Sequence, residues 1–401
     1  MRLSGEEALR LSRRSFMSIG ARTAGPVCSF GLLSLVGKPM LPAPRLLRTT
    51  QSADSAVWME PWRRNILATL KARYCDTAMG EEVGWLIAPV LEALYLAYLA
   101  TADPAWIELQ TEWAQAWIRR GVTEPDGYIG WPKVGAAGTD VDNLDGFYAD
   151  SMLGEAMALR PILLMASSIQ GDPALRSRFG AAAGSHVDLA RRIHEKWERR
   201  AAWRATADEG MISIVLPYGI DRVSGRWTPE GRERNDPSIG FSHPDNKANL
   251  VALWLLAMTD ATGDSKYRDQ AEAWFRLMKS RMHLEKDGTY RIWNYWEPAG
   301  PWDYHAFGVP KHWIGIHPNP GYYETDVKAI VAAYQHQVVF ADGDIERLIR
   351  TAVVSGRMWA ALAVFDCAIR SHLEHTINPE SWDGMILVPW LQSQRHSRCN
   401  D

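Results

Sequence analysis

The feature that most constrains the fold is a two-part pattern that recurs along the chain. Its first part is a short turn between helix-like segments, found at Ala102-Asp103-Pro104, Gly171-Asp172-Pro173, Gly263-Asp264-Ser265 and Gly343-Asp344-Ile345. Its second part is an extended segment, found at Asp126-Gly127-Tyr128, Glu209-Gly210-Met211, Asp287-Gly288-Thr289 and Asp383-Gly384-Met385. Self-similarity on this scale is typical of repeat architectures. The sequence therefore predicts an array of helical hairpins whose connecting loops of one kind lie on one face.

Apolar residues recur at helical spacing in four pairs of segments. The first helix of each pair is expected at Glu81–Ala100, Leu144–Ser168, Asp245–Thr262 and Tyr322–Phe340. The second is expected at Pro104–Arg119, Pro173–Arg199, Lys266–Met282 and Asp344–Phe365. Residues 58–74 and 363–373 predict further helices that complete the array. Asp103 and Asp172, each followed by proline, are typical helix N-caps.

The first helix of each pair is the more apolar, and residues 250–257 are an almost unbroken apolar run. A helix that is apolar all round is buried. The second helix carries charges that we expect to face solvent, as at Arg191, Arg192, Glu195, Lys196 and Glu198. Inner and outer helices alternating around a ring describe an all-α (α/α) toroid of about six or seven pairs, with short strand-like segments at its cleft face.

The N-terminus has the features of an export signal. Arg13 and Arg14 precede Phe16, and a modest apolar stretch, residues 27–36, follows. This order is typical of a twin-arginine signal, and the apolar stretch is too short to span a bilayer as a mature helix. We expect residues 1–42 to be the signal, residues 43–401 to form a single catalytic domain, and the mature protein to be periplasmic or secreted.

Charge and cysteine content narrow the partners. The net charge is −3, and removing residues 1–42 takes away six basic and two acidic residues, which leaves −7. This balance argues against nucleic acid as a partner, although a local cluster of Arg and His can still bind an anion. We expect no membrane partner after signal cleavage. Cys75, Cys367 and Cys399 show no metal-ligand spacing, and no cofactor is expected.

Three long connections, residues 130–143, 217–244 and 298–320, join outer helices to the next inner ones, so all three belong on one face. Loops of this length in a compact domain are usually either functional or disordered. Polar and aromatic side chains cluster on or beside them in residues 140–148, 241–249 and 287–326. Each cluster also has a structural interpretation, since Asn and Asp commonly cap helices and Tyr is common in cores.

The site ingredients are Asn and His at an inner-helix mouth, in Phe241-Ser242-His243-Pro244-Asp245-Asn246, with Arg and Tyr on the later segment Arg291–Tyr295. Together with the hairpin array, they resemble the (α/α)-toroid polysaccharide lyases that act on uronic-acid polymers such as alginate and glucuronan. The resemblance covers the architecture of nearly the whole mature chain. It departs from some of those lyases in one respect, because His243 and Asn246 are not contiguous.

The resemblance implies a β-elimination in which donors neutralise the uronate carboxylate and a tyrosine transfers protons. His243 with Asn246 or Asn143 would be the neutralising groups. Arg291 would lower the pKa of Tyr295, the expected base and acid, with Tyr304 as its substitute. Eight residues are expected to bind the substrate, the aromatic ones by stacking on sugar rings: Trp131, Tyr148, Trp293, Trp296, His305, His312, Tyr322 and Tyr323. The expected partner is therefore an anionic polysaccharide or oligosaccharide.

Two other functions remain open. A toroid glycoside hydrolase, such as an unsaturated-uronyl hydrolase, needs two carboxylates across the bond, which Asp142 or Asp145 could supply with Glu324 or Asp245. A non-catalytic glycan-binding toroid would keep the aromatic cleft alone. No metal is expected, because the spacings of His305, His312 and His317 match no standard ligand motif.

Overall fold

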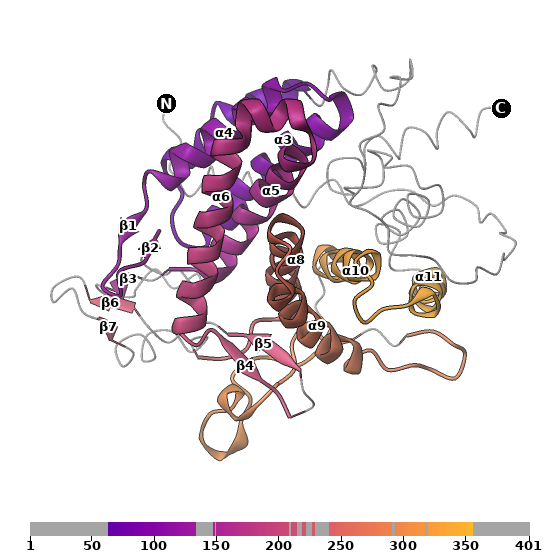
Figure 1. Cartoon of the computed structure of the whole chain (residues 1–401). Helices are drawn as coiled ribbons and strands as arrows, with labels where there is room; N and C mark the ends of the chain where they lie inside the picture. Colours follow the sequence, from indigo (N-terminus) through magenta and orange to yellow (C-terminus); the bar gives the residue numbers. More distant parts are fainter. Residues whose placement is uncertain are drawn as a thin grey trace, which may run out of the picture.

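The computed structural model describes residues 63–133, 147–148, 150–207, 210–214, 219–221, 227–228, 240–290, 293–316 and 320–355. This part of the chain is mainly helical, with strands of only two or three residues, which confirms the all-α class (Figure 1). The expected export signal, the fourth extended segment at Asp383 and the expected helix at 363–373 lie outside the described residues.

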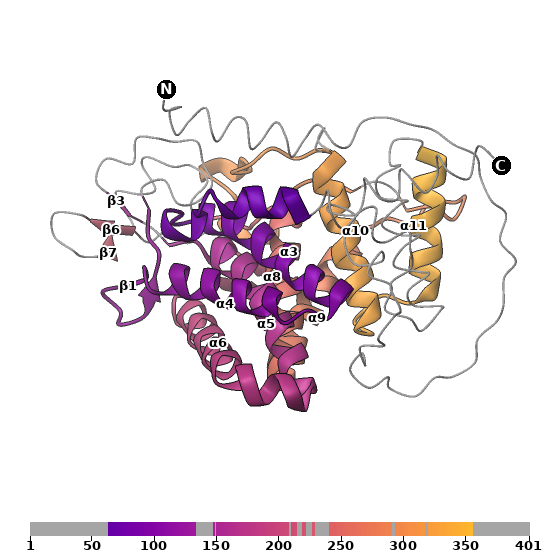
Figure 2. The same cartoon turned by 90° about the horizontal axis from the view of Figure 1, so that it is seen from above.

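Four helical hairpins follow one another along the chain. Their first helices are α3 (Ala88–Thr101), α5 (Met152–Gly171), α8 (Asp245–Thr262) and α10 (Pro320–Gln335). Their second helices are α4 (Ala105–Ile118), α6 (Pro173–Arg199), α9 (Ser265–Ser280) and α11 (Asp342–Ser355). The first helices pack side by side in the order α3, α5, α8, α10, and α4, α6 and α9 each pack on their own partner. In Figures 1 and 2, α10 and α11 lie next to each other at one end of the row.

The turns between the paired helices follow the repeated sequence pattern. The carboxylates of Asp103, Asp172 and Asp264 each accept a hydrogen bond from the backbone N–H two residues further on, at 2.8 to 3.0 Å. Ala102 and Gly263, which end the first helices, adopt left-handed backbone angles with φ of 54° and 70°. The caps therefore fix where each second helix begins, and the predicted bounds of α6 and α8 are confirmed to the residue.

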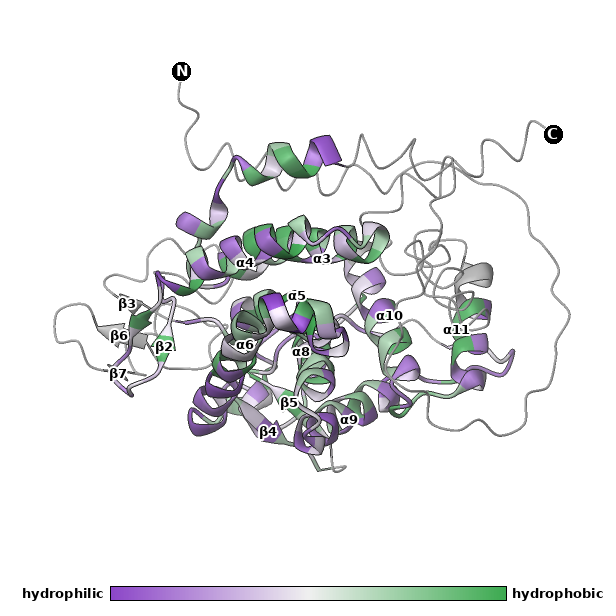
Figure 3. Ribbon diagram, turned by 45° about the horizontal axis from the view of Figure 1, so that its top comes forward, coloured by the Kyte–Doolittle hydropathy of each residue, from purple (hydrophilic) through white to green (hydrophobic). Residues whose placement is uncertain are grey.

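Burial separates the two rows of helices. Thirteen of the eighteen residues of α8 are buried, whereas α6 and α9 bury one face and expose charges on the other. Figure 3 shows the contrast between largely apolar α3 and the charged surface of α6. One expectation for α6 is wrong: Lys196 is completely buried instead of facing solvent. Its partners are described below.

The start of the second inner helix also differs from the prediction. Helix α5 begins at Met152, eight residues later than Leu144. Ser151 is its N-cap and accepts a hydrogen bond from the Gly154 backbone N–H at 3.1 Å. The preceding pair Phe147–Tyr148 is instead a short strand, β3, beside β6 (Gly219–Asp221), and β6 also pairs with β7 (Trp227–Thr228). Pairing with a segment some seventy residues away competes with helix formation there, and local periodicity does not reveal it.

The extended segments after the outer helices are strand-like, as predicted. Strands β1 (Val122–Thr123) and β2 (Ile129–Gly130) form a hairpin after α4, and β4 (Trp203–Ala205) and β5 (Met211–Ser213) form one after α6. An isolated bridge between Leu284 and Tyr290 takes the same place after α9. Gly127 and Gly288 supply the positive φ angles, 84° and 77°, that the first and third turns need. Because each hairpin leads from an outer helix to the next inner one, the hairpins mark one end of the array.

Two stretches, Val83–Thr101 and Met152–Gly171, are long and apolar enough for a membrane span by length and composition alone. Their most apolar windows are 61% and 72% buried inside the fold. Inner helices covered by neighbours on several sides have the same composition. Cys75 is a buried free thiol, and the other two cysteines of the expected mature chain lie outside the described residues.

Candidate functional site

The start of α8 gathers four polar side chains, His243, Asp245, Asn246 and Lys247, which we call the α8 mouth. His243 is held from both sides by Ser213: its backbone N–H donates to the Ser213 carbonyl, and its Nδ1 lies 2.9 Å from the Ser213 hydroxyl. Burial, helped by the charge of Lys247, lowers the pKa of His243 to about 3. The imidazole is therefore neutral, so it can donate or accept a hydrogen bond but cannot neutralise a carboxylate as a cation.

Asp245 joins the α8 mouth to the tyrosine-bearing loop. Its backbone N–H donates to the Tyr295 carbonyl at 3.0 Å, and its Oδ1 forms an ion pair with Arg281. Its Oδ2 is buried with no partner. Burial raises the pKa of Asp245 to about 6 in spite of Arg281. Arg281 also donates to the Glu297 carbonyl at 3.0 Å, so this cation, which the sequence did not single out, is engaged in holding the loop.

Asn246 and Lys247 carry the remaining polar atoms of the α8 mouth. The Oδ1 of Asn246 is buried without a hydrogen-bond partner. Lys247 Nζ donates to Glu81 Oε1 at 2.8 Å, at the edge of the site. Buried amide oxygens in folded proteins almost always have a donor. The orphaned oxygen of Asn246 is therefore the atom for which an external ligand would supply the partner.

Asn249, one turn further along α8, belongs to the core instead. Its amide donates to Asp326 at 2.8 Å and its carbonyl oxygen accepts from the Trp274 indole at 2.7 Å. Trp293 donates to the other carboxylate oxygen of Asp326 at 3.0 Å. Burial, and after it the charge of Asp245, raises the pKa of Asp326 well above its usual range, and both of its oxygens are occupied by core donors, so this carboxyl is structural.

Tyr295 lies directly against the α8 mouth and forms part of an aromatic group. Its ring stacks on Tyr322 from the first turn of α10, with centroids 5.5 Å apart, and lies 5.8 Å from the His312 ring. Burial raises the pKa of Tyr295, and the proximity of Tyr322 and Glu81 raises it further. Tyr295 is therefore a protonated phenol at neutral pH, a proton donor in its resting state. Arg291, expected to lower this pKa, lies outside the described residues.

His312 has a defined orientation beside Tyr295. Its Nδ1 lies 3.2 Å from the Trp313 carbonyl oxygen, which can only accept, so we assign the proton to Nδ1. Nε2 then carries the lone pair. The ring also contacts Phe241 and Trp296. His312 is thus held as a hydrogen-bonding base close to the protonated Tyr295.

Two of the expected sugar-stacking tryptophans are core residues. Trp131 and Trp296 are completely buried, so the prediction that they stack on a substrate is wrong. Trp131 stacks on Trp117 and donates its indole N–H to the Trp117 carbonyl at 2.9 Å. Trp296 donates to the Ser242 carbonyl at 2.9 Å. Both indoles fill space between packed elements. A high tryptophan content alone does not distinguish such core residues from tryptophans that line a cleft.

The remaining expected site residues take several positions. Trp293 is 4% exposed and stacks on Tyr323 with centroids 4.6 Å apart, so this pair packs more deeply than Tyr295 and Tyr322. Tyr304 and His305 are exposed on a loop that starts at Asp303. Glu324 forms an ion pair with Lys328 at 3.5 Å. Asn143, Asp142, Asp145 and His317 lie outside the described residues, and of Tyr148 only the backbone, in β3, is described.

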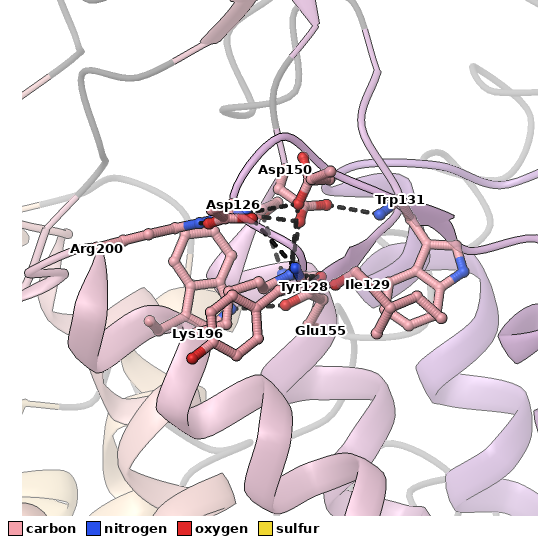
Figure 4. A network of polar contacts seen from close by, with 12 residues as sticks. Asp126, Tyr128, Ile129, Trp131, Asp150, Glu155, Lys196 and Arg200 are labelled. Atoms are coloured by element: carbon pink, nitrogen blue, oxygen red, sulfur yellow. Dashed lines mark hydrogen bonds and ion pairs between the residues drawn. The ribbon is translucent and has the colours of Figure 1, made fainter. Parts of the chain in front are cut away.

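A second polar cluster, which we call the charge network, lies under the β1–β2 hairpin (Figure 4). It consists of two cations and four carboxyl groups: Lys196, Arg200, Glu124, Asp126, Asp150 and Glu155. Lys196 Nζ donates to Asp150 and Glu155 at 2.6 Å each, and to the Ile129 carbonyl at 3.0 Å. Arg200 donates to Glu124 and Asp126 at 2.7 Å each. The network ties the hairpin and the start of α5 to α6.

Proton sharing balances the charge network. Burial, reinforced by Asp150, raises the pKa of Glu124 to about 9 and that of Glu155 to about 8. Burial also acts on Asp150, but Lys196 outweighs it and lowers the pKa to about 2. With Glu124 and Glu155 protonated, two carboxylates face two cations. The buried cluster then carries no net charge, which is the condition for burying so many ionisable groups.

The sequence contains a signal for this network that the prediction missed. Lys196 lies between Ile193 and Trp197, on the buried stripe of α6, and not among the exposed charges. A lysine inside an apolar stripe needs carboxylate partners from other segments. Gly130 is the matching signal on the hairpin, because a Cβ there would collide with the carboxylates of Glu124 and Asp150.

No group of three or more His, Cys, Asp or Glu residues in the described ranges is arranged to hold a metal ion. Comparison with known proteins adds no assignment, since no protein-family model matches the sequence and no curated protein matches it significantly. The chemistry of the α8 mouth must therefore be argued from its own side chains.

Proposed function

We propose that the protein is a polysaccharide lyase that cleaves a uronic-acid polymer, of the alginate or glucuronan class, by β-elimination. The observation that carries the proposal is the contact between the tyrosine loop and the α8 mouth. The Asp245 backbone N–H donates to the Tyr295 carbonyl, and this bond ties the loop with the Tyr295 phenol and the nearby His312 imidazole to the start of α8, the helix that carries Asn246 and Lys247. In this proposal, these side chains supply the proton donor, the proton acceptor and the carboxylate-binding groups.

The reaction needs each of these groups. A base removes the proton at C5 of the uronate, the electron pair forms the C4=C5 double bond, and the C4–O4 bond breaks while O4 takes a proton. In this proposal His312 Nε2 accepts the C5 proton and the Tyr295 hydroxyl donates to O4. Lys247, the side-chain N–H₂ of Asn246 and the positive end of the α8 dipole stabilise the charge that develops on the carboxylate. The raised pKa keeps Tyr295 protonated, so its hydroxyl has a proton to donate, and this replaces the expectation that it acts as the base.

The arrangement of helices supports an anionic substrate. All four inner helices begin at the end of the array where the hairpins lie: α5, α8 and α10 each follow a connection from an outer helix, and the segment before α3 is bonded there through the Gly80 N–H and the Trp131 carbonyl. The positive ends of their dipoles therefore face the same side. We include in the proposal that the array closes into an (α/α) toroid around this face, and that the protein acts in the periplasm or outside the cell.

One observation favours a second function, a glycoside hydrolase. Asp245 has an unpartnered oxygen and a pKa raised to about 6 by burial, which suits a general acid. Its complete burial and its ion pair with Arg281 weigh against contact with a glycosidic oxygen. The lyase is therefore the better-supported proposal.

The test is incubation of the protein with glucuronan, polymannuronate, polyguluronate, polygalacturonate and hyaluronan. A lyase produces the ultraviolet absorbance of a conjugated uronate, whereas a hydrolase produces reducing ends without it. Tyr295→Phe is expected to lower turnover by about 10²- to 10⁴-fold with polymer binding nearly intact, because only the proton donor is removed.

Tyr304→Phe, on the exposed loop, is the matched control and should retain turnover. Normal turnover in Tyr295→Phe together with loss in Tyr304→Phe would transfer the acid role to Tyr304. Reducing ends without the ultraviolet product would replace the lyase with the hydrolase, and binding without either product would leave a glycan-binding protein.

A further inference from the structure

Trp85 departs from the pattern of its own helix. The apolar periodicity of residues 81–100 places it among core residues, yet it is 42% exposed. It lies in a five-residue π-helical turn, η3 (Val83–Ile87), immediately before α3. Such π-turns inside helices are frequent at functional sites. In the described part of the chain, Trp313 is the other strongly exposed tryptophan, and it directly follows His312.

Close packing next to Trp85 keeps the indole turned outward. Gly84 is buried against α5, where a Cβ would lie 2.7 Å from the Met157 sulfur and 3.1 Å from the Gly154 Cα. The backbone of η3 is therefore pressed onto the start of α5, and the extra residue of the π-turn leaves Trp85 on the outer side. The exposed indole therefore offers an apolar face, held at a fixed position, on which a ligand can pack.

The indole is also fixed along its edge and placed next to the proposed site. Trp85 Nε1 donates to Glu81 Oε1 at 3.0 Å, and the same oxygen accepts from Lys247 Nζ at 2.8 Å. Glu81 is 7% exposed, and its charge helps to raise the pKa of Tyr295, so both groups share one electrostatic environment. An in-plane hydrogen bond holds a ring without occupying its faces, which leaves a face for stacking.

We propose that Trp85 is a stacking platform for one pyranose ring of a bound polysaccharide, in a subsite next to the α8 mouth. The C–H face of the sugar packs on the indole, and Lys247 binds the ring's carboxylate in place of Glu81. The anionic sugar as ligand rests on the proposed function, whereas the stacking position rests on Trp85, Glu81 and Lys247. The platform contributes to binding, and not to proton transfer.

The experiment measures binding and turnover separately in Trp85→Ala and Trp85→Tyr. Binding is followed by retardation in gels that contain each of the polyuronates named above, which requires no catalysis. Trp85→Ala should weaken binding about 5- to 10-fold, with the loss in KM and not in kcat, while Trp85→Tyr recovers most of the affinity because it keeps an aromatic face. Leu284→Ala, another exposed apolar residue, is the control and should bind as the wild type does.

The outcomes separate this subsite from the proposed reaction. Retardation that depends on Trp85 in a protein that produces no unsaturated uronate would keep the subsite and overturn the lyase. Unchanged retardation of Trp85→Ala, or equal loss in Trp85→Ala and Trp85→Tyr, would overturn the stacking platform. Absence of retardation of the wild type by every polymer would overturn the ligand class as well.

Discussion

The charge network and the α8 mouth are both buried groups of ionisable side chains at the hairpin end of the array, but they differ in how their polar atoms are satisfied. In the charge network, Lys196 and Arg200 lie inside and take up the carboxylates around them. In the α8 mouth, Lys247 lies at the edge, and buried oxygens of Asp245 and Asn246 have no partner. One oxygen of the charge network, Glu124 Oε1, also lacks a hydrogen-bond partner, but Glu124 is sealed under the hairpin, whereas the two unpartnered oxygens belong to the residues just before Lys247 at the edge of the fold.

This difference separates stability from function more clearly than pKa shifts do. The pKa values of Glu124 and Glu155 are raised further than that of Asp245, yet these two carboxyls are sealed under a hairpin. A perturbed pKa shows burial and charge, and both occur in structural networks. Unpaired polar atoms beside an exposed residue such as Trp85 are the stronger sign of a binding site.

The largest effect is expected for Lys196→Met, which tests whether the charge network stabilises the fold. Removing this cation leaves Asp150 ionised and buried without its main partner, which typically costs about 3–5 kcal/mol of folding free energy. Denaturant unfolding at neutral pH measures the loss. Arg178→Met, which removes a surface ion pair to Glu108 with both side chains more than half exposed, is the control, with an expected loss of at most ~1 kcal/mol. Equal, small losses in both variants would mean that the charge network does not stabilise the fold.

In the α8 mouth, Asn246→Ala should reduce turnover strongly and stability only slightly. Its orphaned Oδ1 makes no hydrogen bond to lose, so unfolding free energy should change by only about 1 kcal/mol. Turnover on the polyuronate should fall by about 10²-fold, because the proposed reaction uses the Asn246 side-chain N–H₂ as a donor to the developing charge. Asn249→Ala, in the core one turn away, should instead lower stability strongly. A large stability loss with normal turnover in Asn246→Ala would make Asn246 a structural residue.

The sequence predicted the helices better than the contacts between them. Helices α6 and α8 begin and end where the caps and apolar runs place them, since both signals are local. The start of α5 was missed because β3 pairs with β6 far along the chain. The same limit hid the charge network: Lys196 meets Asp150 and Glu155 from 46 and 41 residues away, and no spacing rule connects them.

Within the candidate site, the sequence predicted which residues lie close together along the chain, but not which distant residues contact them. His243 and Asn246 were expected at one helix mouth because they are close in sequence. Tyr295 was expected near them, but its protonated state depends on burial and on Glu81, which lies far away in the sequence, in the turn before η3. The exposure of Trp85 could not be predicted from the sequence, because periodicity does not register the extra residue of a π-turn.

The smallest effect is expected in the pH dependence of the free energy of unfolding, which tests whether Glu124 and Glu155 are protonated in the charge network. Glu124 and Glu155 have folded-state pKa values of about 9 and 8, above the ordinary value for glutamate. At a pH between the ordinary glutamate pKa and these raised values, the folded protein holds more protons than the unfolded chain. The free energy of unfolding should therefore fall as pH rises from about 5 to 9, by up to ~1.4 kcal/mol per pH unit for each group. The stability that Asp150 contributes is lost only at acid pH, below this window, because its pKa is lowered.

Glu124→Gln keeps the shape of the side chain and removes one titrating group, so the slope of stability against pH should become shallower and the variant should gain most above pH 8. Glu285 is the matched control, because it occupies the same position in the third hairpin turn. In both residues the backbone N–H donates to the carbonyl four residues further on, at 2.8 Å, but Glu285 is exposed. Glu285→Gln should therefore leave the slope unchanged. If Glu124→Gln left it unchanged too, Glu124 would be ionised in the folded protein and the buried network would carry an uncompensated charge, which contradicts its sealed geometry.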